Sequence, residues 1–311
     1  MTQAGRGRVR AGLATRLAGA GVPALPFLWL AVFFLVPFVI VVKISLSDPA
    51  SAMPPYRPLF ACCGWEQVRG FIEGLDFESY ETLFGDDLYV RAAASSVRIA
   101  AVSTLLLLLV GFPMAYAMAR APVRWRPALV AVVIVPFWTS FLIRVYAWIG
   151  ILKPEGLLNQ GLAALGIADA PLMLLNTETA VYIGIVYAYL PFMVLPLYAV
   201  LEKLDPSLLE AAEDLGAPRW RAFWSVTVPL AVPGVVAGSL LCFIPIVGEF
   251  VIPDLLGGSE TLMIGRTLWA EFFSNRDWPL ASAVAIVLLA ILVIPIVIYR
   301  DVEARRMEGG R

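Results

Sequence analysis

Two charged side chains lie well inside apolar segments of the sequence, where an ionisable group is costly and usually has a specific role. Arg144 and Glu249 lie at a similar depth, past the middle of two different segments. Glu249 could line a path for a cation. It could instead form a structural ion pair with Arg144 or Arg98, or cap the backbone around Gly248. The sequence leaves these interpretations open.

Aromatic side chains with polar groups occur in two further places where a solute could pass. Tyr187 and Tyr189 lie near the middle of another apolar segment, just before Pro191. Their hydroxyl groups need hydrogen-bond partners in a hydrocarbon environment. Together with Trp138 they offer aromatic faces to an ammonium group. Because Tyr and Trp are also common at helix contacts and membrane interfaces, packing is the alternative role.

A polar segment separates two apolar segments between Glu210 and Pro229 and reads EAAEDLGAPRWRAFWSVTVP. Asp205 and Pro206 favour the start of a short helix, and Gly216 can end it in a left-handed conformation. A second helix is expected to start near Pro218 and to end before Pro229. The segment is either a docking site for a soluble partner or an amphipathic surface loop.

The composition is that of an integral membrane protein. Of the 311 residues, 60% are apolar and only 15% are charged, with a mean hydropathy of +0.82. Soluble domains contain roughly 25% charged residues. The net charge of −1 and the lack of an extended basic patch argue against nucleic-acid binding.

The residues that usually hold metals or haem are scarce. The chain has no His and three Cys, so it offers few ligands for zinc or haem and no imidazole group for catalysis. Cys62 and Cys63 are adjacent, which suits neither an ordinary disulfide nor CxxC spacing. A packing or incidental role is expected for this pair, and oxidation is the alternative. We expect no metal site in this chain.

Six apolar segments are long enough to cross about 30 Å of hydrocarbon as helices. They cover residues 25–46, 92–119, 128–151, 178–200, 230–254 and 280–299. The first could be a signal peptide, because several Arg residues precede it, although its apolar core is long for a signal. The predicted fold class is all-α, a polytopic membrane protein with six transmembrane helices.

If the N-terminus is placed in the cytoplasm, most Lys and Arg residues outside the spans fall in segments that also face the cytoplasm, as the positive-inside rule expects. This distribution predicts cytoplasmic tails at 1–24 and 301–311 and a membrane domain at 25–300. It also places 201–229 in the cytoplasm and 47–91 outside. The outer loop is acidic, which is typical of a solvated loop and would also suit a cationic solute or a basic partner.

The spacing within the polar segment resembles a known motif. Permeases of binding-protein-dependent ABC importers carry an EAA loop, in which E-A-A is followed by three residues, G, nine residues and I-x-L-P. Here Glu210, Ala211 and Ala212 precede Gly216 at that spacing, and the motif ends at Pro229 with Val in place of both Ile and Leu. The resemblance implies that this loop couples to an ATPase.

Four further segments resemble the polyamine permeases, and most closely the permease of a putrescine importer. They cover residues 136–153, 180–198, 248–258 and 262–279. The resemblance implies a type I ABC importer permease fold in a bacterial inner membrane. It also implies a second homologous permease subunit, a cytoplasmic ABC ATPase dimer that binds ATP and Mg, and a periplasmic polyamine-binding protein. Transport of spermidine or another small solute is the alternative within this class.

Two other classes of membrane protein are less consistent with the residues. The chain has no Gly-Lys dipeptide and hence no phosphate-binding loop, so it needs no nucleotide cofactor and ATP must be hydrolysed by another subunit. A secondary transporter should show mid-span carboxylates and inverted repeats. A membrane-embedded enzyme should show clustered catalytic groups. Neither pattern is found, so the sequence predicts a transport subunit rather than an enzyme.

Overall fold

The computed structural model describes residues 26–59, 69–70, 74–167 and 170–309, and these residues are mainly helical. The chain forms two compact units, Met1–Gly85 with Asn275–Ala290 and Asp86–Ser274 with Ile291–Arg311. Cys62, Cys63 and the predicted tail 1–24 lie outside the described residues.

The first unit contains an apolar helix, Pro26–Ser45, which includes the π-helical turn η1 (Ala31–Leu35) and α2 (Val36–Ser45). After it, β1 (Asp48–Pro49) pairs antiparallel with β2 (Tyr56–Arg57), and α4 (Glu78–Gly85) follows. The Ser45 and Tyr80 hydroxyl groups are 2.8 Å apart and join α2 to α4. This short strand pair is the one departure from an all-α fold among the described residues.

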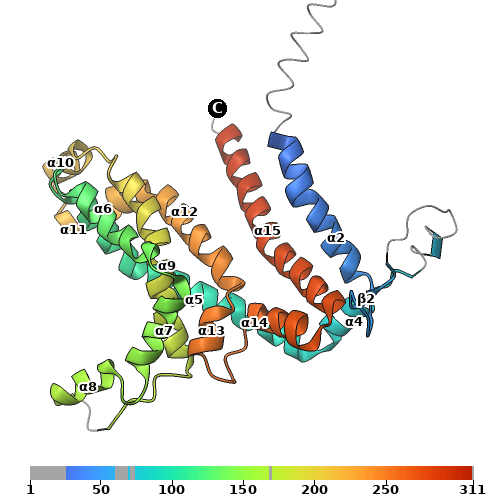
Figure 1. Cartoon of the computed structure of the whole chain (residues 1–311). Coiled ribbons are helices and arrows are strands. Elements are labelled where there is room, and N and C mark those ends of the chain that lie inside the picture. Colours follow the sequence, from blue (N-terminus) through green and yellow to red (C-terminus); the bar gives the residue numbers. More distant parts are fainter. Residues whose placement is uncertain (1–25, 60–68, 71–73, 168–169, 310–311) are drawn as a thin grey trace, which may run out of the picture. The chain divides into compact units, whose positions relative to one another are not determined.

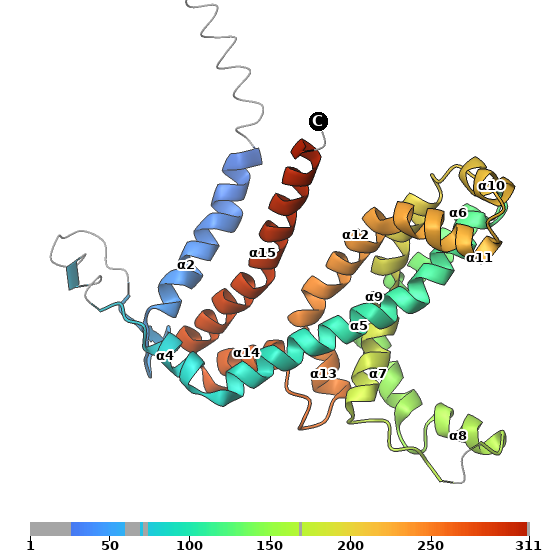
Figure 2. The same cartoon turned by 180° about the vertical axis from the view of Figure 1, so that it is seen from behind.

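Three long helices form the core of the second unit: α5 (Asp87–Arg120), α9 (Glu178–Leu201) and α12 (Val228–Val247). In both views they run past one another, with α10 and α11 near one end of the unit and α8 near the other (Figures 1 and 2). Asp86 Oδ1 caps α5 by accepting from Leu88 N over 2.8 Å. Thr177 Oγ1 caps α9 by accepting from Ala180 N over 3.3 Å.

Glycines allow these helices to approach closely. A Cβ atom on Gly238 of α12 would lie 2.9 Å from Met193 Sδ of α9 and 3.1 Å from the Met193 carbonyl oxygen. Gly234, one turn earlier, would meet the Leu197 Cα at 3.2 Å. The GxxxG pair therefore serves helix packing, as such motifs commonly do in membranes.

The third predicted span, 128–151, is not one straight helix. It consists of α6 (Arg126–Ile134), the 3₁₀-helix η2 (Val135–Trp138) and α7 (Phe141–Leu152), followed by α8 (Leu157–Ala164). The helices before and after the break differ in direction by 88°. Pro136 lies in the 3₁₀ turn, and Thr139 and Ser140 have extended backbones that interrupt the helix.

The segment after α9 contains α10 (Ser207–Asp214), α11 (Arg219–Ala222) and the π-helix η3 (Phe223–Thr227). The prediction that the second of these helices ends before Pro229 is wrong, because Arg219–Val247 is one helix. Pro229 lies in the first turn of α12, directly after the π-helical turn. Proline has no backbone N–H to donate to the helix. Its absence is tolerated at this position, because the π-helical turn η3 changes the hydrogen-bond pattern where α12 begins.

The last part of the chain contains α13 (Val251–Leu256), α14 (Ile264–Trp269), the π-helix η4 (Ala270–Asn275) and α15 (Trp278–Gly309). The fifth predicted span, 230–254, therefore ends earlier than expected, at Val247, and α13 is separate. Four described helices are long and apolar enough to cross a membrane, and the bent pair can provide a fifth. The predicted sixth span falls in α15, whose described apolar part is the shorter Trp278–Val293.

Candidate functional site

The EAA segment, residues 201–229, contains the first short helix that its sequence predicts, followed by the start of the continuous helix Arg219–Val247. α10 begins at Ser207, whose backbone N donates to Asp205 Oδ1 over 2.9 Å. This bond favours the ionised carboxylate and lowers the pKa of Asp205. The helix stops before Gly216, which has a φ of +85°. The predicted helix start, displaced by one residue, and the left-handed glycine stop are confirmed.

The surface of the EAA segment combines the motif residues with apolar side chains. Glu210 and Ala211 are exposed and Ala212 is half-buried. Leu215 and Trp220 are 89% and 65% exposed. Large apolar side chains that stand in solvent on a polar segment are typical of a surface that another protein covers.

Aromatic contacts anchor the EAA segment to the core. The Phe223 ring packs edge-on against Phe112 and Tyr116 of α5, with centroid distances of 5.8 and 5.4 Å. Ala222 and Thr227, which flank this ring on the same helix, are buried. The start of the helix Arg219–Val247 is therefore packed directly against α5.

A second feature is a cavity of about 600 Å³ between α7, α9, α12 and α13, here called the Glu249 cavity. Four phenylalanines contribute to a mainly apolar lining: Phe137, Phe141, Phe192 and Phe250. Tyr189, Glu249 and Arg144 supply polar groups. An apolar cavity with few convergent polar groups is the usual form of a small-molecule site.

Glu249 is 8% exposed, and its carboxylate contacts both a side chain and the backbone. Tyr189 donates its hydroxyl proton to Glu249 Oε2 over 2.5 Å. Glu249 Oε1 accepts from the backbone N atoms of Val251 and Ile252 over 3.0 and 3.4 Å. The carboxylate therefore caps α13, which corresponds to the backbone-capping interpretation of the sequence.

The two arginines named as possible partners of Glu249 make other described contacts. Arg98 Nη2 lies 2.6 Å from Glu178 Oε1. The Arg144 guanidinium lies over the rings of Phe137 and Phe141, at 5.3 and 5.8 Å from their centroids. Its Nε and Nη1 atoms are buried without a hydrogen-bond partner among the described residues.

Tyr187 and Trp138 do not line the Glu249 cavity. The Tyr187 ring packs edge-on against Trp148 at 5.4 Å, and Trp138 is 82% exposed. Of the four residues predicted for a solute path, the structure thus brings Tyr189 and Glu249 together. The four cavity phenylalanines were missed, although Phe137 and Phe141 flank the Pro136 break and a break in a span is a known signal of a binding cavity.

The EAA segment, the long helices and the cavity agree with a match to a known family. Residues 108–308 match the family described as binding-protein-dependent transport system inner membrane component. The chain belongs to this family. Its members are permease subunits of the inner membrane and not enzymes, and the ATPase of such a transporter is a separate subunit.

One relative is similar to this chain over most of the length of both proteins. The chain is 39% identical to the spermidine/putrescine transport system permease protein PotB of Haemophilus influenzae, over 89% of this chain and 91% of the relative. The family membership and the apolar helices establish a multi-pass inner-membrane permease.

Solved structures of the same fold come from a bacterial ABC transporter that imports the acidic polysaccharide alginate. One chain has a TM-score of 0.68 at 18% identity and covers 96% of this chain and 99% of its own length. A second, in complex with an alginate-bound periplasmic protein, has a TM-score of 0.67 at 18% identity and covers 94% of this chain and 96% of its own length. At this identity the likeness concerns the fold alone. The expected importer permease fold is confirmed.

Proposed function

We propose that the chain is the transmembrane permease subunit of an ATP-driven importer that moves polyamines from the periplasm to the cytoplasm. The observation that carries the proposal is the similarity, over most of both chains, to a permease named for spermidine and putrescine. Putrescine is the narrower candidate, because four segments resemble the permease of a putrescine importer. Spermidine is the alternative.

The EAA segment is the proposed contact with the ATPase. Small Ala211 and Ala212 allow close approach, and Glu210 offers an exposed carboxylate to a donor on the partner. Leu215 and Trp220 supply apolar area that a protein partner would cover. The anchoring of Phe223 on α5 would pass movement of the ATPase to the core helices.

The proposed complex contains a second homologous permease, a cytoplasmic ATPase dimer that binds ATP and Mg, and a periplasmic polyamine-binding protein. In this assembly both termini and the EAA segment face the cytoplasm. Lipid surrounds the outward faces of the helices, where many large apolar side chains are exposed.

The Glu249 cavity is the proposed section of the solute path within this subunit. Glu249 would supply negative charge to a passing ammonium group, and Tyr189 would hold the carboxylate in position. Tyr187 and Trp138 are proposed only for packing or for the interface with the second permease. The competing role for Glu249 is a purely structural cap of α13.

The test is uptake by the complete complex reconstituted in lipid vesicles with its binding protein outside and ATP inside. Labelled putrescine and spermidine are supplied separately, with 1,4-butanediol as an uncharged analogue of putrescine. ATP-dependent accumulation of one or both polyamines, but not of the diol, is expected. Failure of both polyamines to accumulate in a complex that hydrolyses ATP would contradict the proposal.

A further inference from the structure

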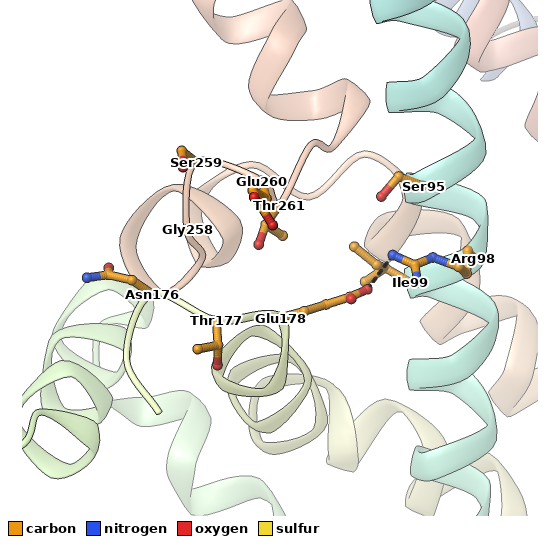
Figure 3. Close-up of a pocket in the computed structure, with 10 residues that line it drawn as sticks. All are labelled: Ser95, Arg98, Ile99, Asn176, Thr177, Glu178, Gly258, Ser259, Glu260 and Thr261. Atoms are coloured by element: carbon orange, nitrogen blue, oxygen red, sulfur yellow. Dashed lines mark hydrogen bonds and ion pairs between the residues drawn. The ribbon is translucent and has the colours of Figure 1, made fainter. Parts of the chain in front are cut away.

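A polar cavity of about 520 Å³ lies at the N-terminal end of α9 and is distinct from the Glu249 cavity. Three parts of the second unit surround it: Ser95–Ile99 on α5, Asn176–Glu178 at the start of α9, and the loop Gly258–Thr261 after α13. Figure 3 shows the side chains of Arg98 and Glu178 directed toward one another across it. We call this cavity the Glu178 pocket.

Close backbone contacts fix one wall of the pocket. A Cβ atom on Gly258 would lie 2.5 Å from the Asn176 carbonyl oxygen, so the two chain segments are in direct contact. Asn176 N donates to Leu256 O over 3.0 Å. Arg266 Nη1 donates to Gly258 O over 3.2 Å, while its Nε lies 3.2 Å from Asp254 Oδ1.

The loop is also joined to α5. Ile264 N donates to the buried Ser96 Oγ over 2.8 Å. Ser96 precedes Arg98 by two residues, so the helix that carries the arginine and the loop that faces it are held together. The pocket is therefore formed before any ligand enters, which lowers the entropic cost of binding.

The charges in the pocket favour a cation. Glu178 Oε1 accepts from Arg98 Nη2 over 2.6 Å and from the Tyr182 hydroxyl over 3.1 Å. Glu260 adds a second carboxylate, and none of the described residues forms an ion pair with it. The lining thus carries two carboxylates and one guanidinium, with hydroxyl groups that can complete the hydrogen bonds of an ammonium ion.

The ion pair between Arg98 and Glu178 is easily exchanged. Their side chains are 61% and 35% exposed. Ion pairs this open to water add little to stability, so another cation can take the place of Arg98 at small cost. The long Arg side chain can turn toward solvent when it is displaced.

We infer that the Glu178 pocket binds a primary ammonium group of the transported solute, which replaces Arg98 on the Glu178 carboxylate. This inference rests on the proposed function for its ligand. Glu178 begins the 24-residue helix α9, and the EAA segment follows the other end, about 36 Å away. The pocket therefore lies on the side from which an imported solute would enter, before it reaches the Glu249 cavity.

The experiment compares Glu178→Gln, Arg98→Gln and the double variant in the reconstituted complex with its binding protein, at subsaturating putrescine. Glu178→Gln should lower putrescine uptake about tenfold, because a charge-assisted hydrogen bond is lost. Arg98→Gln should raise uptake at subsaturating putrescine, because it removes the competing cation. Arg91→Gln is the matched control, since Arg91 forms a more exposed pair with Asp87 on the same helix.

A merely structural ion pair gives a different pattern, and that pattern would overturn the inference. Arg98→Gln and Glu178→Gln would then reduce uptake equally, and the double variant would be no worse than either. Equal uptake by all variants would overturn it as well. Weaker association of the ligand-free binding protein with the Glu178→Gln complex would also overturn the inference, because the pocket would then serve protein docking.

Direct binding separates this inference from the proposed function. Putrescine alone, without binding protein, is titrated calorimetrically into the purified wild-type and Glu178→Gln complexes, with 1,4-butanediol as the uncharged control. Heat that is lost in the variant supports the pocket even if the wild-type complex imports no polyamine. Equal heats for wild type and variant overturn the pocket while leaving polyamine import intact.

Discussion

The Tyr189 hydroxyl donates to Glu249 Oε2 over 2.5 Å, while the other carboxylate oxygen accepts from Val251 N over 3.0 Å. One buried carboxylate thus connects the middle of α9 to the first turn of α13. The same group borders the Glu249 cavity. Its negative charge and its backbone cap are separable roles, because an amide side chain keeps the shape and loses the charge.

Glu249→Gln is expected to lower uptake of a dicationic polyamine at least about tenfold while the complex still assembles, because the ammonium group loses a charged partner. Tyr189→Phe removes one donor and keeps the charge, so a smaller loss is expected. Labelled uptake and size-exclusion chromatography check both variants. Loss of assembly in Glu249→Gln would instead identify the carboxylate as a structural cap.

Gly216→Val should uncouple ATP hydrolysis from transport. At a φ of +85° a β-branched residue is strained by about 1–2 kcal/mol or more, so the junction between α10 and α11 must change. The measurement is the ratio of solute imported to ATP hydrolysed. Gly150→Ala is the control, since a Cβ atom there meets nothing within 4 Å; equal ratios in both variants would contradict the role of this glycine.

Glu210→Arg and Trp220→Asp should weaken binding of the ATPase to the permease. Trp220 is 65% exposed, so the substitution removes apolar area from the proposed interface without opening the core. Co-purification of the ATPase with the tagged permease measures the effect. Arg124, an exposed residue outside the EAA segment, supplies the control Arg124→Gln. Full recovery of the ATPase with Glu210→Arg and Trp220→Asp would show that this surface is not the contact with the ATPase.

Gly238→Leu should destabilise the packing of α12 on α9. Its side chain would meet Met193, whose Sδ lies 2.9 Å from the position of an added Cβ, and overpacking of this kind costs about 1–3 kcal/mol. Thermal unfolding in detergent measures the loss. Met193→Ala should restore part of it in the double variant, whereas Gly161→Ala, where a Cβ meets nothing within 4 Å, should have little effect.

Asp48→Asn should raise the stability of the first unit at neutral pH. Loss of hydration raises the pKa of Asp48, and a hydrogen bond from the protonated Asp48 carboxyl to Asp76 and the charges of Asp76 and Glu78 add to the effect. A raised carboxyl pKa means that the folded state binds the proton more tightly, so wild-type stability increases as the pH falls through that pKa.

Thermal unfolding from pH 8 down to pH 4 checks this sign. The stabilising effect of Asp48→Asn should be greatest at the upper end of the range and should shrink toward the lower end. Glu81→Gln, an exposed carboxyl on α4, is the control. The prediction would be contradicted if wild-type stability fell steadily as the pH was lowered and the Asp48→Asn variant showed the same fall.

Local signals in the sequence predicted local structure well. The stop at Gly216 depends on the backbone of a single residue, and the EAA spacing lies within one short segment. The effect of a proline depends on its surroundings and was harder to predict. Pro136 accompanies a break of 88°, while Pro229 follows a π-helical turn inside a continuous helix.

The contacts of the site depend on which faces of distant helices meet. Tyr187 and Tyr189 differ by two positions, and helical rotation places one against Trp148 and the other against Glu249. The pairing of Arg98 with Glu178 spans 80 positions in the chain. No periodicity within a single segment can indicate such partners.

The unbroken helix Arg219–Val247 has a consequence for how movement spreads during transport. It begins inside the EAA segment and ends two residues before Glu249, about 43 Å away at 1.5 Å per residue. The helix is continuous, yet it contains the π-helical turn η3 and two prolines, Pro233 and Pro245, where a helix can bend. We therefore expect movement at the EAA segment to reach the cavity along this helix, with bending concentrated at these positions.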